Sequence, residues 1–136
     1  AIFGLDLVLA CPPGFEPDAA LLANAQARER ALGTGSVWVT DDPRAAVASA
    51  QVISTDVWAS MGQEDDAERR RRAFAGYCVD DALLGHAAPD ARVLHFLPAH
   101  RGEEISAAAL DGPRSLAWIE AENRLHVGKA ILEAVV

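Results

Sequence analysis

The stretch ARVLHFLP, residues 91–98, is a short apolar run that a proline ends. A run of this kind, bounded by residues that break regular structure, is typical of a strand covered on both faces in a parallel sheet. Three similar runs precede it, at 5–11, 36–40 and 51–57. Because helical patterns separate these runs, we predict an α/β fold: a twisted parallel sheet of about four strands with helices on both faces, in three Rossmann-like layers.

The helical segments carry their own start and stop signals. Asp18 is placed to cap a helix over 18–32, and Gly33 to end it in a left-handed conformation. The pair Asp42-Pro43 predicts a cap followed by a proline in the first turn of a helix over 43–49. Asp80 is a third candidate cap. Further helices are expected at 64–76, 80–86, 105–110 and 116–136.

Composition excludes several classes of function. The formal charge of −8 and the pI of about 4.8 argue against a general binder of nucleic acid or anionic membranes, which needs a basic face. No apolar run approaches the ~20 residues of a membrane span. Cys11 and Cys78 are distant from each other and form no metal-binding spacing with the histidines, which favours a reduced, cytoplasmic protein without a metal site.

Chemistry-bearing residues follow two consecutive strands. The third strand runs into Asp56, and the fourth into the segment 95–98. Ligands of parallel sheets bind beyond the carboxyl ends of the strands, so neighbouring strands would bring these groups together. A carboxylate there suits an ammonium group, and Ser60 with the backbone around Met61 suits a carboxylate. Groups that bind a cation next to groups that bind an anion predict an amino-acid site. Asp56 equally fits a strand-end residue that accepts hydrogen bonds from loop amides.

Three motifs in this order resemble the ornithine carbamoyltransferases. Residues 56–62, DVWASMG, resemble the DVWxSMG signature of that family, and residues 95–98, HFLP, resemble its HCLP motif with the continuation AHRGEE. Residues 121–126, AENRLH, with Lys129 and Ala130, resemble its C-terminal helix motif. The resemblance covers nearly the whole chain.

The resemblance implies transfer of the carbamoyl group of carbamoyl phosphate to L-ornithine, giving citrulline and phosphate without a cofactor. It implies that Asp56, Ser60 and Met61 contact ornithine. It also implies that the Leu97 carbonyl orients the carbamoyl amide and that Arg124 reaches carbamoyl phosphate. His95 is expected at the substrate site as a hydrogen-bonding residue rather than a base. A cytoplasmic homotrimer in arginine metabolism is the parent enzyme implied.

Two departures from the family qualify these expectations. Phe96 occupies the position of the family's cysteine, which normally lies beside the reacting amine. In addition, nothing in the chain resembles the SxRT-type phosphate motif of the family's other half, and the first residue is not a methionine. We therefore expect residues 1–136 to be a partial ornithine-binding domain that lacks its first strand and helix and the carbamoyl phosphate domain, and to be inactive alone.

Alternatives from other classes stay open. Phe96 fits a carbamoyltransferase with a different amine acceptor, and a hypothesis of another class is a non-catalytic binding or regulatory module. The run Arg69–Arg72 suggests a phosphate patch, but Asp65, Asp66 and Glu68 precede its arginines by four residues, which predicts a self-paired helix face. No glycine-rich loop follows a strand, which disfavours nucleotide binding.

Overall fold

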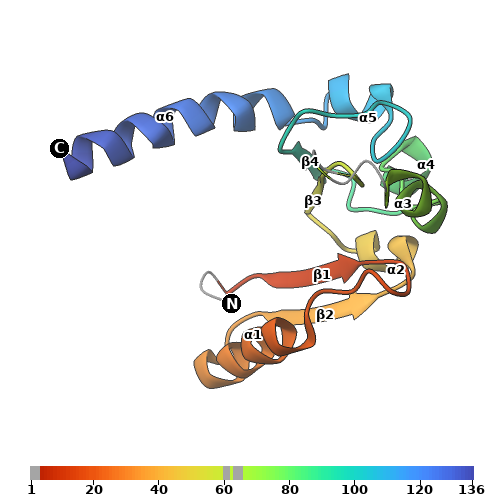
Figure 1. The fold of residues 1–136 in the computed structure, drawn as a ribbon, viewed down its shortest axis with the longest axis horizontal. Coiled ribbons are helices and arrows are strands. Elements are labelled where there is room, and N and C mark those ends of the chain that lie inside the picture. Colours follow the sequence, from red (N-terminus) through yellow and green to blue (C-terminus); the bar gives the residue numbers. More distant parts are fainter. Residues whose placement is uncertain (1–3, 60–61, 63–65) are drawn as a thin grey trace. The chain divides into compact units, whose positions relative to one another are not determined.

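Helices and strands alternate along the chain in the computed structural model, which describes residues 4–59, 62 and 66–136 (Figure 1). The strands are β1 (Asp6–Ala10), β2 (Ser36–Thr40), β3 (Val52–Thr55) and β4 (Arg92–His95). The helices are α1 (Ala19–Leu32), α2 (Pro43–Val47), α3 (Ala67–Ala73), α4 (Asp81–Leu84), α5 (Ala107–Asp111) and α6 (Ala117–Val135). The predicted elements are all present, and the α/β class is confirmed.

The strands pair in parallel but form two sheets of two, where we predicted a single sheet. β1 pairs with β2, and β3 pairs with β4. The chain correspondingly divides into two compact units, Ala1–Ala46 and Val47–Val136. Apolar runs predict strands but do not encode which strands become neighbours, so the division was beyond the reach of the sequence pattern.

The predicted caps form as expected. The Asp18 carboxylate accepts from the backbone of Ala20 and Leu21 at the start of α1, and Gly33 ends that helix at φ 65°. Asp42 accepts from Arg44 and Ala45 at the start of α2. Asp80 likewise accepts from Leu83 in α4 at 2.8 Å. These contacts satisfy backbone donors that the first helical turn leaves without partners.

The hydrophobic core described for the second unit lies around β3 and β4. It contains ten buried residues: Val47, Ile53, Val79, Leu83, Leu84, Val93, Ile105, Ala109, Leu110 and Ala117. Ile53 and Val93 are directly paired across the two strands. The core therefore supports the sheet from which the candidate site projects.

α6 forms close to its expected range and leaves its apolar side chains exposed. Every residue from Ala121 onward is exposed, including Leu125 at 64% and Leu132 at 63%. The helical period therefore predicted the helix and not a packing partner for its apolar face. No helix among the described residues has the length and apolar character that crossing a bilayer requires.

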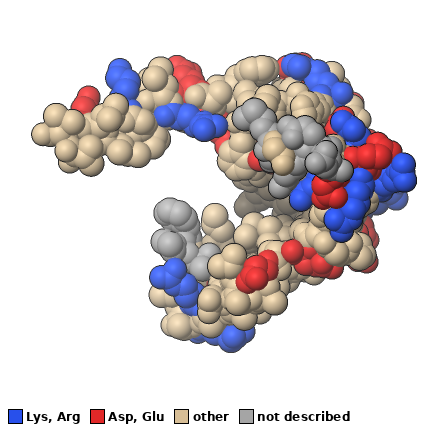
Figure 2. All heavy atoms as spheres, viewed as in Figure 1, with Lys and Arg blue, Asp and Glu red and all other residues tan. Residues whose placement is uncertain are grey.

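The arginine run in α3 is paired with acidic side chains. Arg70 contacts Asp66 at 3.2 Å, and Arg72 contacts Glu68 at 3.0 Å, both one helical turn apart. Arg71 reaches Glu103 at 3.0 Å. Figure 2 shows blue and red side chains interleaved on this side of the molecule. The predicted self-paired face is confirmed for Asp66 and Glu68, whereas Asp65 lies outside the described residues.

Candidate functional site

The ends of β3 and β4 lie side by side and carry the candidate site. The last residues paired between the two strands are Thr55 and His95. Asp56 and Phe96 follow them directly, so both residues leave the sheet at the same edge. The amino-acid pocket predicted from the sequence requires this adjacency.

Asp56 is exposed and already has one local partner. One carboxylate oxygen accepts from the Val57 backbone N–H at 2.8 Å. This bond is the loop-amide contact that we considered as the simpler interpretation. It leaves the second carboxylate oxygen able to meet a ligand ammonium group, so the two interpretations are compatible.

Aromatic packing holds the segment that follows Asp56. Trp58 stacks on Phe74 with ring centroids 5.9 Å apart, and Phe74 meets Tyr77 edge-on at 5.7 Å. The guanidinium of Arg70 donates to the Trp58 carbonyl at 3.0 Å. Ser60 and Met61, the two residues predicted to hold the amino-acid head, lie outside the described residues.

The turn after β4 has an unusual backbone. Leu97 has φ 53°, and the peptide bond between Leu97 and Pro98 is cis. A positive φ costs a residue with a branched side chain on the order of 1 kcal/mol, so neighbouring contacts must hold it. The predicted strand 91–97 accordingly ends two residues early, at His95.

Three hydrogen bonds hold this turn. The Leu97 N–H donates to Nδ1 of His95 at 2.9 Å, and the His95 N–H donates to the Glu120 carboxylate at 3.1 Å. Arg124 donates from its guanidinium to the Phe96 carbonyl at 3.3 Å. Arg124, predicted from α6 to reach the substrate site, therefore lies against the turn that carries Leu97.

His95 is fully buried and has both ring nitrogens engaged. Nδ1 accepts from Leu97, and Nε2 lies 3.1 Å from Oε1 of Glu104. Because Nδ1 accepts, the ring proton is on Nε2 and is donated to the carboxylate. The ring thus offers no polar atom to a ligand in this structure and acts on the turn instead.

Phe96 presents its side chain at the edge of the sheet. It is 48% exposed, whereas the adjacent His95 is completely buried. The ring supplies apolar surface and no polar group.

Glu104 and Glu120 are the site residues that the sequence reasoning missed. Charged residues are rarely buried, so a glutamate after Gly102 and Glu103 indicates an exposed loop. Glu104 is nevertheless completely buried. The one available signal was the adjacent Ile105, which is also completely buried and shows that the chain turns inward there.

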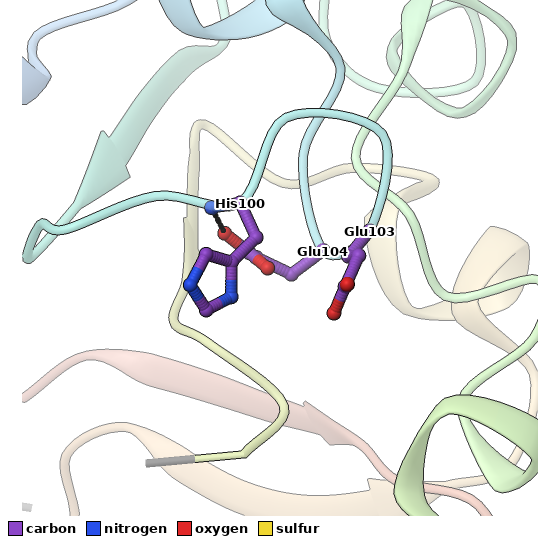
Figure 3. A group of neighbouring side chains, drawn as sticks. All are labelled: His100, Glu103 and Glu104. Atoms are coloured by element: carbon purple, nitrogen blue, oxygen red, sulfur yellow. Dashed lines mark hydrogen bonds between the residues drawn. The ribbon is translucent and has the colours of Figure 1, made fainter. Parts of the chain in front are cut away.

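His100, Glu103 and Glu104 form a group whose ligand atoms lie within 4.8 Å of one another (Figure 3). Two of the three are already engaged. Glu103 is paired with Arg71, and Oε1 of Glu104 accepts from the His100 N–H at 2.6 Å as well as from His95. Arg71 neutralises Glu103, and hydrogen-bond donors occupy Oε1 of Glu104, so we assign no metal to the group.

The comparisons with known proteins concern the whole chain. Residues 1–135 match the family model described as aspartate/ornithine carbamoyltransferase, Asp/Orn binding domain. The chain is 55% identical over all of its 136 residues to an ornithine carbamoyltransferase of Geobacter sulfurreducens, of which it covers 44%.

Solved structures agree. The ornithine carbamoyltransferase of Pyrococcus furiosus is similar with a TM-score of 0.85 and 48% identity, over 94% of this chain and 41% of that one. An N-acetyl-L-ornithine transcarbamylase is similar with a TM-score of 0.81 and 31% identity, over 97% of this chain and 40% of that one. The chain spans less than half the length of the relatives it matches. Since the family model extends over all but its last residue, the chain belongs to the aspartate/ornithine carbamoyltransferase family and matches its Asp/Orn binding domain.

Proposed function

We propose that residues 1–136 are the amino-acid-binding part of an ornithine carbamoyltransferase. The observation that supports this most directly is the pairing of Thr55 with His95, because it brings Asp56 and the Leu97 turn to one sheet edge. Arg124 adds a cation at the same turn. A carboxylate, a backbone carbonyl and a guanidinium are the groups needed for an amine acceptor and an anionic carbamoyl donor.

The proposed reaction joins the side-chain amine of ornithine to the carbamoyl carbon. The new N–C bond forms, the C–O bond to phosphate breaks, and the amine loses a proton, giving citrulline and phosphate. Asp56 holds ornithine through an ammonium group, and the Leu97 carbonyl accepts from the carbamoyl amide. Arg124 stabilises negative charge on the donor, and Ser60 and Met61 hold the amino-acid head.

The test is a hybrid in which this chain replaces the matching segment of the Geobacter sulfurreducens enzyme. We expect the hybrid to form citrulline and the 136-residue chain alone to form none. Asp56→Asn in the hybrid should lower kcat/KM for ornithine by about 100-fold, because the ammonium loses its counter-charge. Glu16→Gln, at an exposed position of the first unit, serves as the matched control and should leave the rate unchanged. A folded hybrid that Asp56→Asn does not slow would contradict the proposal.

A second candidate function is carbamoyl transfer to another amine. Phe96 favours it, since this half-exposed ring is bulkier than a cysteine side chain and supplies no thiol. The similarity to a protein named N-acetyl-L-ornithine transcarbamylase supports this candidate. Rates of the hybrid with ornithine, N-acetylornithine, lysine and putrescine separate the candidates, and Phe96→Cys should raise the rate with ornithine if ornithine is the acceptor.

A non-catalytic role makes a different prediction. A binding or regulatory module would leave the hybrid inactive with every acceptor, with or without Phe96→Cys, while calorimetry on the hybrid still detected ornithine. We also propose a trimeric parent enzyme that works in the cytoplasm in arginine metabolism. Light scattering of the hybrid tests the trimer, and a monomer or dimer with full activity would contradict it.

A further inference from the structure

The carboxylate of Glu104 is completely buried and makes unequal use of its two oxygens. Oε1 accepts from Nε2–H of His95 at 3.1 Å and from the His100 N–H at 2.6 Å. Oε2 is buried without a hydrogen-bond partner. Burying a carboxylate costs free energy unless hydrogen-bond donors compensate for the lost water. In Glu104 these donors are the His95 ring and the His100 backbone.

The bond to Glu104 determines what the other side of the His95 ring can do. With its proton on Nε2 facing the carboxylate, Nδ1 is free to accept from Leu97 at 2.9 Å. A ring flipped or rotated away from Glu104 would bury an unpaired N–H and would lose the Leu97 bond at the same time. The carboxylate and the Leu97 N–H therefore fix the ring from opposite ends.

We infer that Glu104 is a positioning residue: through the His95 ring it holds Leu97 in its left-handed conformation and so aims the Leu97 carbonyl at the edge of the β3–β4 sheet. The φ of 53° at Leu97 is unfavourable for a leucine and requires such support. Since the carbonyl direction depends on the backbone angles of Leu97, support from a residue seven positions away would set the geometry of the predicted carbamoyl contact.

Glu103 provides the contrast within the same loop. Its carboxylate is 30% exposed and pairs with Arg71, with no bond to His95 among the described contacts. Figure 3 shows the two glutamates leaving neighbouring positions of the loop while only Glu104 bonds to the His100 backbone. Glu103→Leu is therefore a control that removes an adjacent carboxylate without touching the turn.

The first measurement needs only the unaltered chain. Long-range proton–nitrogen NMR of the His95 ring should show a proton on Nε2 and none on Nδ1 at neutral pH. A proton on Nδ1 would overturn the inference, because that atom could then not accept from Leu97. This result stands even where a variant fails to fold.

The second measurement compares amide hydrogen exchange at Leu97 with that at Val93, a buried strand residue whose N–H donates to the Arg114 carbonyl at 2.9 Å. Glu104→Leu should raise the Leu97 rate relative to the Val93 rate by about tenfold or more. Glu104→Gln, which keeps an acceptor oxygen for His95, and Glu103→Leu should both leave the ratio nearly unchanged. Equal acceleration at both amides, or no change at Leu97, would show a merely structural role.

The catalytic consequence rests on the proposed function and is measured separately. In the hybrid enzyme, Glu104→Leu should lower kcat by about 10- to 100-fold through misplacement of the carbonyl, while KM for ornithine changes by less than about twofold. A rise in KM with unchanged kcat would contradict the positioning role. If the unaltered hybrid transfers no carbamoyl group, the proposed function fails, whereas the NMR and exchange results still decide whether Glu104 positions Leu97.

Discussion

The two units are built from the same kind of element but are stabilised differently. Each contains one parallel strand pair and a crossover with helices. Among the described residues, the first unit buries Val37 and Pro12, whereas the second contains the ten-residue cluster around β3 and β4. Hydrogen bonds also join the elements of the first unit, such as Ser36 to Asp6 at 2.7 Å and Gln26 to the Val37 carbonyl at 3.2 Å.

The buried carboxylates show the same difference. Glu29 of α1 is 7% exposed and has Oε1 without a partner. Glu104 also has one unpartnered oxygen, but its other oxygen holds two donors. Both units therefore contain a parallel strand pair, which alone does not position a site. Accurate placement of site residues also needs a hydrophobic core and a buried polar network beneath the strand ends.

Removing core volume should produce the largest difference between the units. Leu110 is completely buried in the second unit, so Leu110→Ala should cost about 3 kcal/mol in the free energy of unfolding. Leu32, 58% exposed at the end of α1, is the control, and Leu32→Ala should cost about 0.5 kcal/mol or less. Urea unfolding followed by far-UV circular dichroism gives both values. Equal costs would break the comparison.

In the first unit, the largest loss in the free energy of unfolding should come from disturbing the close approach of Gly35 to the Leu5 backbone. Gly33 and Gly35 both have positive φ, but an added Cβ meets nothing within 4 Å at Gly33 and would lie 2.5 Å from the Leu5 carbonyl at Gly35. Gly33→Ala should therefore cost about 1 kcal/mol from φ alone. Gly35→Ala should cost about 2 kcal/mol or more, because strand β2 must move away from Leu5. Hydrogen exchange of β1 and β2 amides measures the effect, and similar costs at the two glycines would show that the close approach is unimportant.

The reactivity of the two thiols should show the smallest effect, and it should not differ between the two units. Burial raises the pKa of Cys11, with a further contribution from Glu16. Burial likewise raises the pKa of Cys78, with contributions from Asp80 and Glu104. Both thiols are free. Since a raised pKa leaves less thiolate at a given pH, alkylation by iodoacetamide should be slow at pH 8 and should still be rising with pH above 9.0, the ordinary pKa, before it levels off.

Glu16→Gln sharpens the thiol measurement. It removes the negative charge that helps to raise the pKa of Cys11, so Cys11 should react faster at pH 8 while Cys78 keeps its rate. Mass spectrometry after timed alkylation distinguishes the two cysteines. Faster reaction at Cys78 would indicate that Glu16 acts on the whole chain rather than on its neighbour.

Local signals explain why so many elements were predictable. Asp18, Asp42 and Asp80 each cap the helix that follows, because the required contact lies two or three residues along the chain. The end of β4 was misjudged by two residues, since the apolar character of Phe96 and Leu97 continues the strand pattern. The positive φ of Leu97 that ends it depends on contacts with residues distant in sequence.

The sequence by itself determined the alternating α/β elements, their caps, the self-paired face of α3 and the three motifs that place Asp56, Leu97 and Arg124 in a family. These features rest on contacts within a few residues or on residue identity. Only the tertiary structure decided that the strands pair two by two, and that Glu104 is buried against His95. Strand neighbours and buried hydrogen-bonded pairs join segments that are separated along the chain, and no local pattern records which segments the hydrophobic core brings together.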